Sequence, residues 1–343
     1  MNLNKLVRDN IKSLTGYSSA RSEFNQQGKI YLDANESPFQ NGVNRYPDPF
    51  QNELKQLLAK RKNSTNENIL LGNGSDEVLD LIFRCFCEPK KDNILLFTPT
   101  YGMYEVLAAI NEIDIRSYAL DEKFDFDPSG VLKKTDENTK LIFVCSPNNP
   151  SGNRIDSDKI IALANSFNGL IILDEAYIEF TKEGSLMKEL NNLPNLIICQ
   201  TMSKAYGMAG IRLGMAFASK QIVAILNKVK PPYNINQLTI NKAINVLNDP
   251  NKLEREISTI IKEREKLASA LNKLAIVITV FPSDANFLLV RFTDAYFVYQ
   301  NLIAQGIVVR NRAKEFNCDN CLRISIGTKN ENEQLLKALK TII

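Results

Sequence analysis

Short apolar runs alternate with polar stretches of helical period through the middle of the chain. Each run is almost continuously apolar, which is typical of a strand covered on both faces. The clearest runs lie at Ile94–Phe97, Leu141–Cys145, Leu170–Leu173 and Leu196–Cys199. Between them, stretches such as Asp156–Phe167 carry the spacing of a helix. The alternation predicts a mostly parallel sheet with helices on both sides.

The pattern differs towards the two ends of the chain. Apolar residues in the segment 1–14 share one helical face, so we predict an amphipathic helix there. Residues 36–49 contain three Pro and one Gly, which indicates an extended loop, and residues 50–58 return to a helical period. After about residue 250 a long charged helix, Lys252–Lys273, is predicted. Four further strands and a C-terminal helix follow it, at Ile276–Phe281, Phe287–Arg291, Ile307–Arg310 and Leu322–Ile326.

This change of pattern predicts a second, smaller α+β unit behind the larger α/β unit. We expect residues 1–28 to form an N-terminal arm and part of the small domain. Residues 29–248 then form the large domain and residues 249–343 the small C-terminal domain. A chain of 343 residues is long enough for two domains.

The amino-acid composition argues against several classes of function. The 42 Lys and Arg residues nearly balance 39 Asp and Glu, so a broad nucleic-acid-binding surface is not expected. The chain has no His, which excludes Ser-His-Asp and Cys-His mechanisms and every metal site with a His ligand. Neither a signal peptide nor an apolar run of about 20 residues is visible, so we expect a cytoplasmic protein without a membrane segment.

Six cysteines include two close pairs, Cys85 with Cys87 and Cys318 with Cys321. A zinc site would require the two pairs to meet, and no metal is expected. Reduced thiols are the simpler interpretation, with Cys145 and Cys199 buried inside strands.

Residues that could bind a ligand or take part in a reaction lie where strands end, which is where ligands bind in open α/β sheets. The turn Gly72-Asn73-Gly74-Ser75-Asp76 leads directly into an apolar helical run, so its backbone N–H groups could hold a phosphate. Ser75 or Asp76 could instead only cap that helix. Asp174 ends a buried strand, where a carboxylate needs a cation or donors, and a structural ion pair is the alternative.

Two further segments follow strands. Lys204 lies between Ser203 and a glycine-rich stretch that ends at Arg212. It is either a solvated surface lysine or a partly desolvated amine able to form a Schiff base. Asn149 belongs to a Pro- and Asn-rich turn that composition alone would explain. Together the segments supply an amine, a carboxylate, amide and hydroxyl donors and a phosphate cradle, which are the needs of pyridoxal phosphate.

In this order the motifs resemble the fold-type I pyridoxal phosphate enzymes, whose fold is that of the aspartate aminotransferases. They resemble most closely the histidinol-phosphate aminotransferases. The segments that carry this closer resemblance are Tyr17–Arg21, Leu32–Glu36, Asn44–Pro49, Pro99–Tyr104, Asp174–Phe180 and Cys321–Thr328. The resemblance covers the whole chain and implies an α/β fold. Its large domain has a mostly parallel seven-stranded sheet between helices, and a smaller α+β domain follows.

The resemblance also implies roles for individual residues. Lys204 carries pyridoxal 5'-phosphate as a covalent aldimine and shuttles the proton, and Asp174 pairs with the ring nitrogen. Asn149 and Tyr177 bind the ring oxygen, and Tyr101 stacks on the ring. The cofactor phosphate is held by Gly74, Ser75, Asp76, Ser203, Arg212 and, from the neighbouring subunit of a homodimer, Tyr46.

For the substrate, the resemblance implies an anion site at Arg323. Arg310 adds a second contact, with Arg312 close enough to take its place, and Tyr17 and Asn35 line the same pocket. The implied reaction moves an amino group between L-histidinol phosphate and 2-oxoglutarate. The alternatives on this scaffold are an aromatic aminotransferase and a threonine-phosphate decarboxylase. A cofactor-sensing transcription regulator is disfavoured, because 40 residues ahead of the cofactor domain cannot hold a DNA-binding module.

Overall fold

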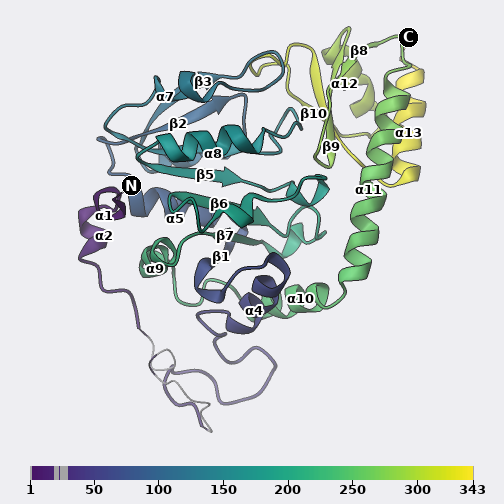
Figure 1. Cartoon of the computed structure of the whole chain (residues 1–343). Coiled ribbons are helices and arrows are strands. Elements are labelled where there is room, and N and C mark those ends of the chain that lie inside the picture. Colours follow the sequence, from purple (N-terminus) through teal and green to yellow (C-terminus); the bar gives the residue numbers. More distant parts are fainter. Residues whose placement is uncertain (1, 19–22, 24–29, 343) are drawn as a thin grey trace.

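The computed structural model describes residues 2–18, 23 and 30–342 of the chain. Residues 19–21 of the Tyr17–Arg21 segment, and the end of the expected arm at residues 24–28, lie outside the described residues. Figure 1 shows a large α/β body and a smaller body at the C-terminal end of the chain. Among the described residues, no helix combines the length and the apolar character needed to cross a membrane.

Seven strands of the described chain form the sheet of the large body. They are β1 (Ile69–Asn73), β2 (Asn93–Thr98), β3 (Asp114–Ala119), β4 (Thr139–Cys145), β5 (Leu170–Asp174), β6 (Leu196–Thr201) and β7 (Leu213–Phe217). Their order is β1-β7-β6-β5-β4-β2-β3, and only β7 runs antiparallel to its neighbours. The structure confirms the mostly parallel sheet. Because β7 is reversed, it begins at the edge where the parallel strands end.

Alternate residues of these strands enter two separate apolar clusters, one on each face of the sheet. In β4, Ile142 and Val144 belong to one cluster and Leu141 and Phe143 to the other. This explains the continuous apolar runs of the sequence. One face is covered by α4 (Asn52–Lys62), α7 (Pro128–Leu132), α8 (Ser157–Ser166) and α10 (Gln237–Leu247), and the other by α5 (Gly74–Phe86), α6 (Met103–Ile110) and α9 (Lys220–Val229).

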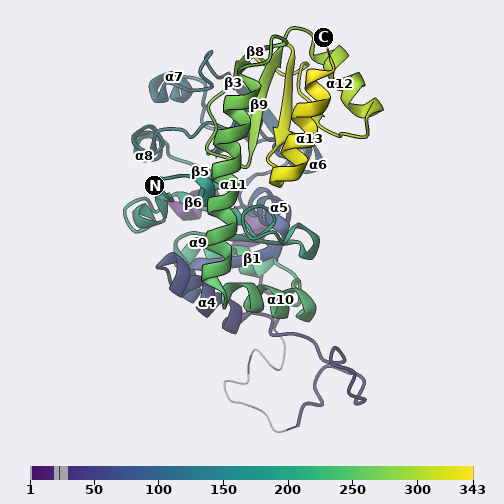
Figure 2. The same cartoon turned by 90° about the vertical axis from the view of Figure 1, so that its right-hand side faces the viewer.

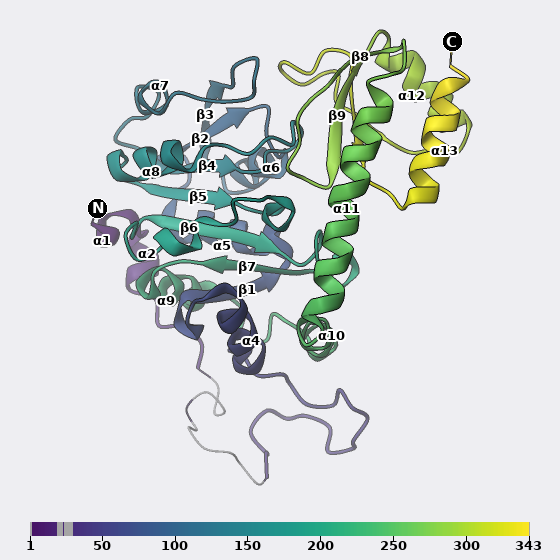
Figure 3. The ribbon, with the colours of Figure 1, turned by 45° about the vertical axis from the view of Figure 1, so that its right-hand side comes forward.

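The small body holds a four-stranded antiparallel sheet in the order β10-β11-β9-β8. Its elements are β8 (Val277–Val280), β9 (Phe287–Phe292), α12 (Ala295–Ala304), β10 (Arg310–Asn311), β11 (Cys321–Ser325) and α13 (Lys329–Lys340). The long helix α11 (Pro250–Leu271) leads into it from the large body, as Figures 2 and 3 show. The predicted strand at Ile307–Arg310 is wrong in extent, because only Arg310 and Asn311 pair with β11.

The N-terminal segment differs from the single helix predicted for residues 1–14. It forms two one-turn helices, α1 (Leu3–Leu6) and α2 (Asp9–Lys12), separated by extended backbone at Val7 and Arg8. The break allows the Arg8 N–H to bond to the Cys85 carbonyl at 3.0 Å, and its guanidinium to pair with Glu88 at 3.1 Å. Leu6, Val7 and Ile11 pack into the cluster that contains α5 and α9, so these residues join the large body. The predicted domain boundaries themselves stay a prediction.

Four 3₁₀ turns complete the described chain. They are η1 (Asn66–Asn68), η2 (Ile178–Phe180), η3 (Leu186–Glu189) and η4 (Ala209–Ile211). All six cysteines are buried free thiols, and Cys145 and Cys199 lie in β4 and β6 as expected. No cluster of metal-ligating side chains was found in the part of the chain that the structure describes.

Candidate active site

A cavity of about 380 Å³ opens at the carboxyl edge of the large sheet. Strands β4, β5 and β6 end there, α5 begins there, and one wall comes from β10 and β11 of the small body. The residues that line it are Ser75, Asp76, Tyr101, Cys145, Asn149, Asp174, Ala176, Tyr177, Thr201, Ser203, Lys204, Ala209, Arg212, Arg310, Arg312 and Arg323. The position agrees with the general rule for open α/β sheets.

Helix α5 offers its first turn to this cavity. Asn73 is its N-cap residue and the Asn73 side chain makes no capping hydrogen bond, so the alternative that Ser75 or Asp76 serves as the cap is wrong. The backbone N–H groups of a first helical turn have no intrahelical acceptors and attract anions. Glu77 fixes the start of the turn, because its Oε2 accepts the Asn73 N–H at 2.5 Å and Asn234 Nδ2 at 2.9 Å.

Strand β7 packs against the same turn through a glycine. A Cβ atom on Gly214 would lie 2.1 Å from the backbone nitrogen of Ser75, so no side chain fits at this position. Gly74 has a φ of +73°, a left-handed conformation that glycine adopts without strain. Arg212 adopts φ +51°, which costs roughly 1 kcal/mol for a residue with a side chain. Its carbonyl accepts the Gly74 N–H at 2.9 Å and its guanidinium pairs with Asp76 at 3.3 Å.

Asp174 is 3% exposed, at the end of β5. Its carboxylate accepts a hydrogen bond from the Tyr104 hydroxyl at 2.6 Å and another from the Ala176 N–H at 3.0 Å. Burial raises the pKa of Asp174, and the Tyr104 hydrogen bond acts in the opposite direction. Asp174 has no ion-pair partner among the described residues, so the structural ion pair considered as an alternative is wrong. A buried carboxylate that faces a cavity in this way suits a cationic N–H group of a ligand.

Tyr104 is a residue beside this cavity to which the sequence analysis assigned no role. It is completely buried, and its own pKa is raised by burial and by the neighbouring Asp174, so its hydroxyl remains a donor. Its backbone N–H donates to the Tyr101 carbonyl at 3.2 Å, in the turn that starts α6. The spacing of two tyrosines three residues apart, 101 and 104, was the available signal.

Lys204 lies in the loop between β6 and η4 and remains open to solvent through the cavity. The surrounding protein lowers its pKa by desolvation, and Arg323 lowers it further by repulsion. Its Nζ lies 5.7 Å from the centre of the Tyr177 ring. Lys204 is therefore not a remote surface lysine: it faces the same cavity as Asp174 and has the depressed basicity of a nucleophilic amine.

Asn149 links the large body to the arginine wall. Its side-chain oxygen accepts from Arg323 Nη1 at 2.5 Å and from Arg312 Nη2 at 3.4 Å. Its amide nitrogen donates to the Tyr177 hydroxyl at 3.4 Å. Because both guanidiniums hold the oxygen, the amide nitrogen is turned towards Tyr177 and the cavity.

The remaining sequence predictions divide into two groups. Tyr101 lines the cavity, and its hydroxyl donates to Asp76 at 3.3 Å, while Ser203 and Arg310 also lie in the lining. Tyr17, Asn35 and Tyr46 do not line it. Tyr17 is 73% exposed, and Asn35 and Tyr46 border a second cavity of about 540 Å³, where the Tyr46 ring stacks on Tyr233 at 4.4 Å. The roles of all these residues stay predictions.

Comparisons with known proteins agree on one family. Residues 29–339 match the family model described as aminotransferase class I and II. A relative named histidinol-phosphate aminotransferase from Flavobacterium johnsoniae is 52% identical, and the match covers 99% of this chain and 98% of the relative.

Similar solved structures include histidinol-phosphate aminotransferases and an L-threonine-O-3-phosphate decarboxylase from Porphyromonas gingivalis. The histidinol-phosphate aminotransferase of Clostridium acetobutylicum is similar with a TM-score of 0.81 and 30% identity, over 88% of this chain and 91% of that one. The Sinorhizobium meliloti histidinol-phosphate aminotransferase in complex with pyridoxal-5'-phosphate has a TM-score of 0.78 and 26% identity, over 87% and 82% of the two chains.

Proposed function

We propose that this chain transfers the amino group of L-histidinol phosphate to 2-oxoglutarate. It belongs to the histidinol-phosphate aminotransferase family of the class I and II aminotransferases. The products are imidazole acetol phosphate and L-glutamate, a step of histidine biosynthesis. The observation that carries the proposal is the meeting of Lys204, Asp174 and Arg323 in one cavity. A nucleophilic amine, a buried acid and an anion receptor are the three groups that such a transfer requires.

The residues present fit pyridoxal phosphate. The Asp174 carboxylate has no ion-pair partner among the described residues and therefore suits a protonated ring nitrogen. The first turn of α5, together with Arg212, suits a phosphate. When bound, pyridoxal phosphate supplies an aldehyde that an amine can join and a ring that withdraws electrons from the substrate Cα. Asn149 and Tyr177 offer donors for the ring oxygen, and Tyr101 is available to stack on the ring face.

In this mechanism Lys204 Nζ would hold the cofactor through its aldehyde and would remove the proton from the substrate Cα. Its lowered pKa leaves a larger share of the amine unprotonated and able to act as a base at neutral pH. The Asp174 carboxylate would keep the ring nitrogen protonated. Arg323 binds the distal anion of either substrate, since a planar guanidinium suits both a carboxylate and a phosphate.

The proposal includes a homodimer in which Tyr46 of the partner subunit reaches the cofactor phosphate, and a location in the cytoplasm. Support for a second copy comes from the segment 30–50, where large apolar side chains are exposed. Leu32 is 90% exposed and Phe39 81% exposed. Side chains of this kind on one extended segment are typical of an interface rather than of a free surface.

The test is an assay of the purified protein with L-histidinol phosphate and 2-oxoglutarate, in parallel with phenylalanine and with threonine phosphate. We expect glutamate formation to be fastest with histidinol phosphate. Release of carbon dioxide from threonine phosphate, or a preference for phenylalanine, would contradict the proposal. Lys204→Ala is expected to lose turnover, and borohydride reduction followed by peptide mapping should place the cofactor adduct on Lys204 of the unaltered protein.

A further inference from the structure

Three guanidinium groups form one wall of the cavity. Arg310 in β10 pairs directly opposite Arg323 in β11, and the Arg312 N–H donates to the Cys321 carbonyl at 3.0 Å. Arg310 and Arg312 therefore follow the same edge of β11, and all three arginines line the cavity. Arg323 and Arg312 meet at a single acceptor, the side-chain oxygen of Asn149.

Only one carboxylate offsets this positive charge within the described part of the chain. Glu315 pairs with Arg312, whereas Arg310 and Arg323 have no ion-pair partner there. Burial lowers the pKa of Arg323, and repulsion from Arg312 lowers it further. The wall thus carries two positive charges in excess, and an anionic ligand is needed to relieve their repulsion.

We propose that Arg312, held by Glu315, is a specificity-determining residue that favours substrates whose distal anion is a phosphate monoester over those with a carboxylate. The inference rests on the proposed function and deepens it. A phosphate monoester carries about two negative charges at neutral pH and has three acceptor oxygens, so it can accept from Arg310, Arg323 and Arg312 together. A carboxylate carries one charge and two acceptor oxygens, so Arg323 and Arg310 satisfy it without Arg312.

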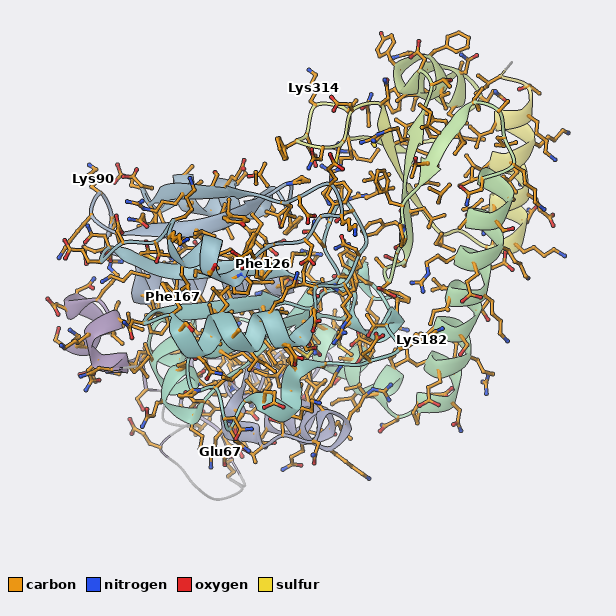
Figure 4. All side chains as sticks on the ribbon, turned by 45° about the horizontal axis from the view of Figure 1, so that its top comes forward. Glu67, Lys90, Phe126, Phe167, Lys182 and Lys314 are labelled. Atoms are coloured by element: carbon orange, nitrogen blue, oxygen red, sulfur yellow. The ribbon has the colours of Figure 1, made fainter. Side chains whose placement is uncertain are left out.

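The arrangement of the pair distinguishes this role from that of an ordinary surface ion pair. The side chain of Arg312 is 15% exposed, and its Nε and Glu315 Oε2 are buried without a hydrogen-bond partner. Two polar atoms left unsatisfied are costly unless the pair rearranges when a ligand binds. Lys314, between the two residues, is exposed and points away from the body, as Figure 4 shows. The loop therefore presents one cation to the cavity and another to solvent.

The experiment measures binding to the cofactor-loaded protein of two probes that lack an amino group, imidazolylethyl phosphate and imidazolylpropanoate. Calorimetry gives the dissociation constant of each. We expect Arg312→Gln to weaken the phosphate probe by about tenfold to a hundredfold, as for the loss of one charged hydrogen-bond donor, and the carboxylate probe about threefold or less. Glu315→Gln should tighten the phosphate probe, because it frees Arg312. Lys314→Gln is the matched control and should change neither constant.

Two outcomes would overturn the inference. One is an equal loss for both probes in Arg312→Gln, and the other is a Glu315→Gln variant that loses phosphate binding, since both indicate that the pair only supports the loop. If Arg312→Gln does not fold, Glu315→Gln and Arg312→Lys, which keeps the charge, decide the question. Preference for the phosphate probe without turnover of histidinol phosphate would instead refute the proposed function and leave the role of Arg312 standing.

Discussion

The hydrogen bond from Tyr104 to Asp174 gives the most direct test of how the acid is prepared for its ligand. Tyr104→Phe keeps the buried ring and removes only the hydroxyl, which lies 2.6 Å from the carboxylate. A hydrogen bond to a charged group contributes about 1.5–3 kcal/mol, so the ionised acid loses about that much stabilisation. The pKa of Asp174, already raised by burial, should rise further. We expect the dissociation constant of pyridoxal phosphate to increase, by up to about tenfold to a hundredfold, once the pH falls below the raised pKa of the variant acid.

The assay is equilibrium dialysis of the apoprotein against pyridoxal phosphate, repeated across a range of pH. The loss should grow as the pH of the measurement falls, because the variant acid becomes protonated at a higher pH than the wild-type acid. Tyr118→Phe is the matched control, since Tyr118 lies on the edge strand β3 and its ring packs on Phe97 away from the cavity. An unchanged cofactor affinity in Tyr104→Phe, or an equal loss in both variants, would refute the reasoning.

Three further predictions concern single substitutions. Arg323→Ala should raise KM in both half-reactions, because each substrate places an anion there; an effect on glutamate alone, seen in separate half-reaction kinetics, would contradict a shared site. Asp174→Asn should weaken cofactor binding yet stabilise the apoprotein at pH 7, by roughly 1 kcal/mol or more, because it removes a buried charge. Since the folded-state pKa of Asp174 is raised, its penalty is complete above that pKa, and the difference in melting temperature should vanish below the unfolded carboxylate pKa. Glu77→Gln should speed cofactor release about threefold to tenfold through a looser Asn73 turn, and dialysis showing no change would count against that role.

Strands β2, β4, β5 and β6 could be predicted from the sequence because they are buried on both faces and form continuous apolar runs, whereas β1 and β7 are also buried but were not named. Strand β3 could not be predicted, since five of its six residues are exposed at the sheet edge and their polar character resembles that of a loop. The spacing of apolar residues could not predict the break in the N-terminal helix either. It depends on the Cys85 carbonyl and on Glu88, which tertiary packing brings to Arg8.

In the candidate site, too, some residues could be predicted from the sequence and others required the structure. Lys204, Asp174 and Asn149 were visible because each follows a strong strand signal, and parallel strands end at a common edge. Tyr104 was missed because its hydroxyl function depends on which side chain a neighbouring strand brings to it. The separation of Arg312 from Lys314 also required the structure, since both are basic residues of one loop and only the cavity distinguishes them.

The contact between Gly214 and Ser75 sets a limit on how this architecture can be altered. The anion-binding turn takes part of its shape from main chain lying on main chain, so any side chain at position 214 would displace it. An engineer who moves this receptor into another scaffold must therefore bring the reversed strand along with the helix.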